Sequence, residues 1–218
     1  MTTTSPQVPE TAAFNPRINP RKARIYKAAM QLFSEHGDPE ANVSELASIA
    51  GVARGTIYNN IGDLGTLFSD VSGHVTAEMG TRLALALDRV AEPERRLAMA
   101  IRVFIRRSHE EPYWGKFMMR YALSNPSFEA LLIGLPLHDV VHGLEAGRYT
   151  FRPEQLASVL AMVGGTVLSA MRMVQEGHKT WRDAGTDAAE LVLRAMGVPA
   201  SEAQAIAAAE LPVLPVLE

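Results

Sequence analysis

Apolar residues recur at intervals of three and four through most of the chain, which is the period of a helix with one buried face. In residues 21–33 this stripe consists of Ile25, Ala28, Ala29, Leu32 and Phe33. A longer stripe over residues 63–90 predicts one long helix from about Asp63 to Val90. The pattern therefore predicts an all-α protein of about nine helices.

Proline divides the rest of the chain into further helices, because it suits the first turn of a helix and interrupts a helix interior. We expect helices to begin near Pro93, Pro112, Pro126 and Pro153. The predicted ranges are 94–109, 113–123, 126–147, 154–176 and 183–196, followed by a short helix after residue 200. The helix over 154–176 combines large apolar residues with a face of small ones, which suits close packing between helices.

The first of these helices, over residues 94–109, carries many basic side chains. They are Arg95, Arg96, Arg102, Arg106 and Arg107. We interpret them as a solvated face of the helix. The alternative is a binding site for an anionic effector or partner.

Residues 42–61 predict two short helices joined by a tight turn. Asn42 is a favourable N-cap, and Glu45 three residues later can complete a capping box. Gly51 stands where the chain must turn, and glycine adopts a positive φ at little cost. Val52 and Ile57 are spaced to return apolar side chains to the same small core.

The remaining positions of the second short helix are free to face outward. They are small, basic, hydroxylated or amide-bearing, and such side chains contact phosphates and base edges in a major groove. Upstream, from Arg17 to Lys27, five Lys or Arg residues occur without an acidic residue, which suits a phosphate backbone. The stretch alone also fits a helical hairpin inside an ordinary all-α protein.

Two runs of sequence closely resemble the DNA-binding domain of TetR-type transcriptional regulators. They are R-I-Y-K-A-A-M-Q-L-F-S-E-H-G and V-S-E-L-A-S-I-A-G-V-A-R-G-T-I-Y. The resemblance covers roughly residues 20–70. It implies a homodimer whose N-terminal helix-turn-helix domains bind DNA. It also implies a larger, divergent helical domain that dimerises and usually binds a small-molecule effector.

With this resemblance the chain divides into four parts. We predict a disordered N-terminal arm over 1–19, a helix-turn-helix domain over 20–66, an effector-binding and dimerisation domain over 67–205, and a C-terminal tail over 206–218. The apolar tail L-P-V-L-P-V-L-E is expected to dock on the body of the protein or on the other subunit. In the family, the last two long helices pair with their symmetry mates, and the alternative is that both lie in the interior of a monomer.

The expected function is transcriptional repression that a small-molecule effector releases. The operator is expected to be a palindrome in double-stranded DNA, since a two-fold protein matches a two-fold site. Arg54 and Asn59 are candidate base readers, whereas Thr56 and Tyr58 are candidate phosphate anchors. The predicted DNA-contacting residues are Arg21, Lys22, Asn42, Ala53, Arg54, Gly55, Thr56, Tyr58, Asn59 and Asn60.

The chain departs from the family pattern directly after this helix. Ile61 replaces the usual aromatic residue, Leu64 the usual lysine and Gly65 the usual acid. In the family the lysine contacts a phosphate, and one such contact contributes about 0.9 to the salt dependence of binding. We therefore expect weaker or less salt-sensitive DNA binding. The alternative function is a helix-turn-helix dimer with degenerate DNA binding that acts as a small-molecule or protein-binding module.

Residues 113–123 are rich in methionine and aromatic side chains, which can form either core or a ligand pocket. In TetR-type regulators the central helices usually enclose the effector cavity, and this lining would suit an apolar or aromatic effector. The predicted effector-contacting residues are Phe104, Trp114, Phe117, Met118, Tyr121, His138, Met162 and Thr166.

His138 and His142 share a helix face at the spacing of helical zinc sites, with Asp139 between them. No third ligand is evident nearby, so we predict two ordinary helix histidines. A regulatory metal site, or His138 in the effector cavity, is the alternative. The prediction includes no metal and no cofactor.

Composition narrows the remaining choices. The 218 residues carry a formal net charge of −3 and include no cysteine, which excludes disulfides and thiolate chemistry. We find no run of 18 apolar residues and no secretory signal, so we expect a cytoplasmic protein without a membrane segment. The chain also lacks a G-x-S-x-G motif and a phosphate-cradling glycine loop, so we predict no enzymatic activity.

Overall fold

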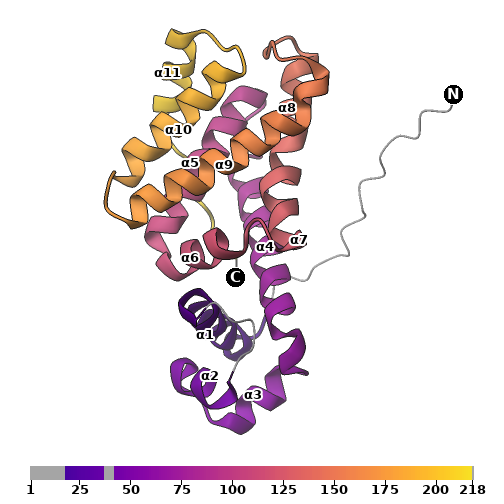
Figure 1. The fold of residues 1–218 in the computed structure, drawn as a ribbon, viewed down its shortest axis with the longest axis vertical. Coiled ribbons are helices and arrows are strands. Elements are labelled where there is room, and N and C mark those ends of the chain that lie inside the picture. Colours follow the sequence, from indigo (N-terminus) through magenta and orange to yellow (C-terminus); the bar gives the residue numbers. More distant parts are fainter. Residues whose placement is uncertain (1–17, 37–41, 218) are drawn as a thin grey trace, which may run out of the picture.

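The computed structural model describes residues 18–36 and 42–217, and within these residues it consists of helices without any strand. A small helical domain lies below a larger one, and α4 runs between them (Figure 1). The all-α prediction is confirmed. The predicted arm over residues 1–19 lies outside the described residues except for Ile18 and Asn19.

The small domain and the connecting helix comprise the first part of the chain. Their elements are α1 (Pro20–His36), α2 (Val43–Ala50), α3 (Arg54–Asn60), the 3₁₀ turn η1 (Leu64–Thr66) and α4 (Leu67–Ala86). The long helix predicted from Asp63 to Val90 is shorter, because the Asp63 side chain caps η1 by accepting a hydrogen bond from the Gly65 amide at 2.9 Å. The half-buried Leu64 packs against the core.

The larger domain contains the remaining helices. They are α5 (Pro93–Glu110), α6 (Pro112–Tyr121), α7 (Pro126–Glu129), the π-helical turn η2 (Ala130–Gly134), α8 (Leu135–Glu145), the 3₁₀ turn η3 (Pro153–Gln155), α9 (Leu156–Gln175), α10 (Trp181–Ala195) and α11 (Ala200–Ala208). The predicted helix over 126–147 is thus one helical run made of α7, η2 and α8. This division accounts for one of the additional helices, since the described residues contain eleven α-helices where about nine were predicted.

The helix-turn-helix forms through local interactions that its sequence encodes. Asn42 caps α2 by accepting a hydrogen bond from the Ser44 amide at 2.9 Å. Glu45, predicted to reach back to this cap, has a carboxylate oxygen 3.6 Å from Nδ1 of His36 on α1. Gly51 has a φ of 63° and turns the chain toward α3, a conformation that favours glycine.

An aromatic cluster joins the small domain to the larger one. Phe33 on α1 packs edge-to-face on Phe68 of α4, and Phe68 packs in the same way on Tyr121 of α6. The Tyr121 hydroxyl also donates to the Phe33 carbonyl at 3.1 Å. On the same side, Tyr26 meets His74 edge-to-face, and burial lowers the pKa of His74. The small domain is therefore fastened at α1 as well as through α4.

Four charged side chains, which we call the α4–α5 charge network, link α4 to the larger domain. They are Glu78, Arg82, Arg107 and Glu111. The buried Arg107 donates to Glu78 at 2.6 Å, and Glu78 also accepts from Arg82 at 2.8 Å. The Arg107 guanidinium lies 4.5 Å from the centre of the Trp114 ring. The prediction of a solvated arginine face on α5 was therefore wrong for Arg107, whose side chain is only 5% exposed.

Helix α5 is the centre of the larger domain, because it packs against α6, α8, α9 and α10. The segment Pro153–Gln175, which contains α9, is long and apolar enough to cross a membrane by length and composition. In this protein, however, α9 packs on α5 and α10, as the core helix of a bundle does. We therefore assign its apolar residues to helix packing.

The ring of Tyr149, which follows α8 in the chain, packs on Gly143 of that helix, and this contact allows a prediction about stability. A Cβ atom added at Gly143 would lie 2.1 Å from Cε2 of Tyr149, whose ring is buried and whose pKa is raised by that burial. Gly143→Ala should lower the free energy of unfolding by about 1–3 kcal/mol, as overpacking a core does. Urea unfolding measures this change.

Gly73→Ala is the matched control, because a Cβ at Gly73 in the middle of α4 meets no atom within 4 Å. It should raise stability by up to about 1 kcal/mol through helix propensity alone. Equal stability of the two variants would contradict the assigned packing of Tyr149 on Gly143.

Candidate DNA-binding surface and effector pocket

Helix α3 presents a polar face to solvent. Ile57 is its buried residue and fixes the helix on the small domain. Arg54 and Asn59 are exposed, and Tyr58 retains 61% of its surface. Ala53 is the exposed N-cap residue, so the first turn of α3 is open to an approaching ligand. The face predicted to enter a major groove is therefore sterically available.

Two asparagines tie the end of α3 to the start of α1. Asn60 donates from Nδ2 to the Thr56 carbonyl at 2.8 Å and accepts from Nδ2 of Asn19 at 3.3 Å. Asn19 also caps α1 by accepting from the Arg21 and Lys22 amides at 2.8 and 3.0 Å. These contacts bring the basic start of α1 beside α3, and they give Asn60 a structural role inside the protein.

The other predicted DNA-contacting residues differ in how freely they can reach a ligand. Arg21 is exposed, whereas the Lys22 ammonium lies 5.3 Å from the centre of the Tyr26 ring. Asn42 already uses its side-chain oxygen to cap α2. A Cβ at Gly55 would meet no atom within 4 Å, so the surface beside it is open.

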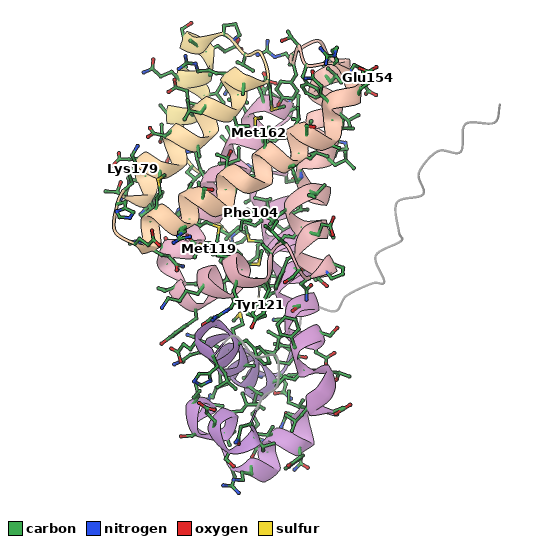
Figure 2. The ribbon with its side chains drawn as sticks, viewed as in Figure 1. Phe104, Met119, Tyr121, Glu154, Met162 and Lys179 are labelled. Carbon is green, nitrogen blue, oxygen red and sulfur yellow. The ribbon has the colours of Figure 1, made fainter. Side chains whose placement is uncertain are left out.

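A partly open pocket of about 110 Å³ lies between α4 and the larger domain, lined by residues of α4, α5, η2, α8 and α9. Its walls are mostly apolar. They consist of Gly80, Leu83, Ala84, Leu87, Leu97, Ala100, Ile101, Phe104, Leu131, Leu132, Leu135, Pro136, Val163, Gly164 and Val167. Arg96 and Asp139 supply the charged groups of the lining. Figure 2 shows Phe104 in the interior of this domain.

The two charged groups form an ion pair at the pocket wall. Nε of Arg96 on α5 donates to Oδ1 of Asp139 on α8 at 2.8 Å. Arg96 also donates from Nη1 to the carbonyls of Leu87 and Val90, at 2.8 and 3.1 Å. Leu87 is the C-cap residue of α4. Arg96 therefore connects the pocket, α8 and the end of α4.

Phe104 is the predicted effector-contacting residue that the structure places in this lining. Trp114, Phe117 and Met118 are fully or almost fully buried in the core around α6. Tyr121 lies at the junction of the two domains, as Figure 2 also shows. The large apolar residues predicted to line the pocket at α6 are core residues instead. The sequence does not distinguish the two, because core and pocket are lined by the same residue types.

The remaining predicted residues lie outside the lining as well. The His138 side chain is 81% exposed. Met162 and Thr166 on α9 are half-buried neighbours of the lining residues Val163 and Val167, and the Thr166 hydroxyl donates to the Met162 carbonyl at 2.7 Å. The helical periodicity of the sequence predicts that this region of α9 lies near the pocket. It does not determine which of two adjacent faces of the helix lines the pocket.

Sequence reasoning missed Arg96 and Asp139. Arg96 was interpreted as solvated, and Asp139 was considered only as the residue between two histidines. The rings of His138 and His142 have centroids 6.0 Å apart, and the described residues contain no cluster of three or more side chains able to hold a metal ion. The sequence shows one charged residue on each of two separate helices, and only the packing of α5 against α8 reveals that half-buried Arg96 and buried Asp139 form a pair.

The fold and these two sites define a class of protein, a helix-turn-helix regulator with an internal pocket. Family models match both parts of the chain. "Bacterial regulatory proteins, tetR family" matches residues 25–60, and "Tetracyclin repressor-like, C-terminal domain" matches residues 92–209. The chain belongs to the TetR family of transcriptional regulators, as its helix-turn-helix sequence indicated.

Solved structures with a similar fold are found as well. RolR, in a crystal structure with the ligand resorcinol, is 28% identical, with 89% of this chain and 96% of that chain covered and a TM-score of 0.66. The fatty acid degradation regulator FadR from Bacillus halodurans is 19% identical, with 84% and 100% covered and a TM-score of 0.69. An ArpA-like gamma-butyrolactone receptor is 18% identical, with 86% and 95% covered and a TM-score of 0.66. No curated protein matches the chain.

Proposed function

We propose that this protein is a homodimeric repressor that binds a palindromic operator through α3 and leaves it when a small hydroxylated aromatic compound enters the pocket. The observation that carries this proposal is the double role of α4. This helix follows the helix-turn-helix after the short turn η1. Three of its residues line the pocket, Gly80, Leu83 and Ala84, together with its C-cap residue Leu87. A ligand in the pocket therefore touches the element that positions α3.

The size and lining of the pocket support a compact aromatic effector. An apolar cavity of about 150 Å³ holds benzene, and the space here is about 110 Å³. RolR, the 28% identical relative, was crystallised with resorcinol, a dihydroxybenzene. A single aromatic ring is therefore the effector size that we propose.

The Arg96–Asp139 pair supports a hydroxyl group on that ring. The contacts of the pair within the described residues use Nε and Nη1 of Arg96 and Oδ1 of Asp139, which also lies 3.4 Å from Nδ1 of His138. Nη2 of Arg96 and Oδ2 of Asp139 therefore offer a donor and an acceptor to a ligand. A hydroxyl group can accept from the guanidinium and donate to the carboxylate at the same time. A carboxylate ligand would be attracted by Arg96 but repelled by Asp139.

Arg96 also provides a route from the pocket to α4, because its guanidinium holds the carbonyls of Leu87 and Val90. A ligand that redirects Arg96 would release the C-terminal end of α4. The effector then lowers operator affinity by the difference between its affinities for the two positions of α4.

Exposed faces of α9 and α10 support the homodimer. Ala157, Ala161, Gly165, Ser169 and Met173 follow one another at intervals of four along α9, and all five are exposed in the single chain. On α10, Leu191 retains 59% of its surface. The first four of these residues on α9 are small, which allows two helices to approach closely, and the pairing of these faces across a two-fold axis would place two copies of α3 for a palindromic operator.

Selection of bound fragments from random-sequence duplex DNA tests the operator part of the proposal. The purified protein should recover a palindrome. Arg54→Ala should lower affinity for that palindrome by about 1–3 kcal/mol, because a base-reading arginine is lost. Fluorescence anisotropy with the recovered duplex measures the change.

Arg95→Ala is the matched control, since Arg95 is exposed on α5 near α11, outside the small domain. It should bind the palindrome like the wild type. Recovery of no sequence above background at low salt would instead favour the dimer with degenerate DNA binding, for which the replacement of the family lysine by the half-buried Leu64 is the supporting observation.

A pocket-filling variant tests the effector part. Ala100→Phe places a ring in the space that the effector would occupy, whereas Ala100→Ser keeps the space free. Resorcinol should raise the Tm of the wild type and of Ala100→Ser, because a ligand that binds only the folded state stabilises it. It should leave the Tm of Ala100→Phe unchanged.

Benzoate should raise the Tm of none of the three proteins. Equal stabilisation of the wild type by benzoate and by resorcinol would contradict the role of Arg96 and Asp139 in recognising a hydroxyl group.

A further inference from the structure

The C-terminal segment, residues 210–217, has a repeat of its own. Leucine occurs at 211, 214 and 217, proline at 212 and 215, and valine at 213 and 216. Exposure follows this repeat, since Val213 and Val216 are 78% and 82% exposed while Leu211 and Leu214 pack against the core. A period of three is that of a polyproline II helix. One ridge of the segment is thus built to lie on the protein.

Two arginines hold the backbone of this part of the chain. Arg102 on α5 donates to the Ala209 carbonyl at 2.6 Å, and Arg82 on α4 donates to the Pro215 carbonyl at 2.7 Å. A polyproline II backbone makes no internal hydrogen bonds, so its carbonyls are free to accept them from side chains. Hydrogen bonds from a charged donor are stronger than those between neutral groups.

The segment reaches α4 from the far end of the larger domain. Figure 1 shows the yellow chain leaving α11 at one end of this domain and ending near α6, close to the small domain. Arg82 is a member of the α4–α5 charge network, with Oε1 of Glu78 at 2.8 Å and Oε1 of Glu111 at 3.6 Å. The Pro215 carbonyl therefore extends a network that already fixes α4 on α5.

This contact lies outside the part of the chain that the family domain explains. The matching model for the C-terminal domain ends at residue 209, directly before the segment. The helical bundle is complete without residues 210–217, because α11 ends at Ala208. Arg82 and the leucine ridge thus serve an addition to the shared fold, while Arg102 holds Ala209, the last matched residue before it.

We propose that residues 210–217 form a strap that holds α4 against α5 and thereby favours the DNA-binding state over the effector-bound state. The pocket lies between these same helices and offers about 110 Å³, less than the roughly 150 Å³ of a cavity that holds benzene, so an aromatic ring that enters it would push α4 outward. Contacts made in only one position of α4 shift the equilibrium toward that position. The strap therefore raises operator affinity and opposes release.

The proposal rests on the operator binding proposed above, and the test separates the two by a second readout. Full-length protein is compared with a variant lacking residues 210–218, with Leu214→Ser and with the matched control Val213→Ser. Leu214 faces the core and Val213 faces solvent, so the two point variants differ in which ridge they alter. The Kd for the selected operator and the hydrogen exchange of residues 79–86 on α4 are measured for each.

The truncated protein and Leu214→Ser should bind the operator about 10-fold more weakly, within the roughly 5- to 150-fold range of allosteric coupling, and α4 should exchange faster. Val213→Ser should match the wild type in both measurements. Unchanged α4 exchange in the truncated protein and Leu214→Ser would overturn the strap, whether or not the wild type binds DNA. Faster exchange with unchanged or tighter operator binding would overturn its proposed effect on the DNA-binding state.

Discussion

The position of α4 depends on the α4–α5 charge network, and much of the structure depends on the position of α4. Arg107 is buried and is compensated by Glu78 and Glu111, so removal of one partner would leave an uncompensated charge in the core. A network of this kind is satisfied only in well-defined arrangements of its side chains. We therefore expect α4 to occupy discrete positions, which is the property that a switch between two affinities requires.

Within the described residues, three sets of contacts hold α4 in place. The aromatic cluster around Phe68 fixes its start to α1 and α6, and Arg96 holds its end at the carbonyls of Leu87 and Val90. Between them, Arg82 binds both the charge network and the carbonyl of Pro215. In the proposed mechanism, operator, effector and C-terminal segment all act by favouring one position of α4.

The sequence predicted those features that arise within a few neighbouring residues. The Asn42 cap, the Gly51 turn and the exposed face of α3 follow from local spacing, and the structure contains all three. Features that join distant helices could not be read in this way. The Arg96–Asp139 pair spans α5 and α8, and Asn60 bonds to Asn19 across 41 positions. Trp114 and Phe117 suited core and pocket equally, and only the packing around them distinguished the two.

Distances between the two recognition domains of the dimer test the central claim, that α4 has two positions. The chain contains no cysteine, so Ser48→Cys on the exposed surface of α2 accepts one spin label per subunit. Electron-spin distance measurements should give two populations in the free protein, of which operator DNA selects one and resorcinol the other. A single distance that neither ligand changes would contradict the account.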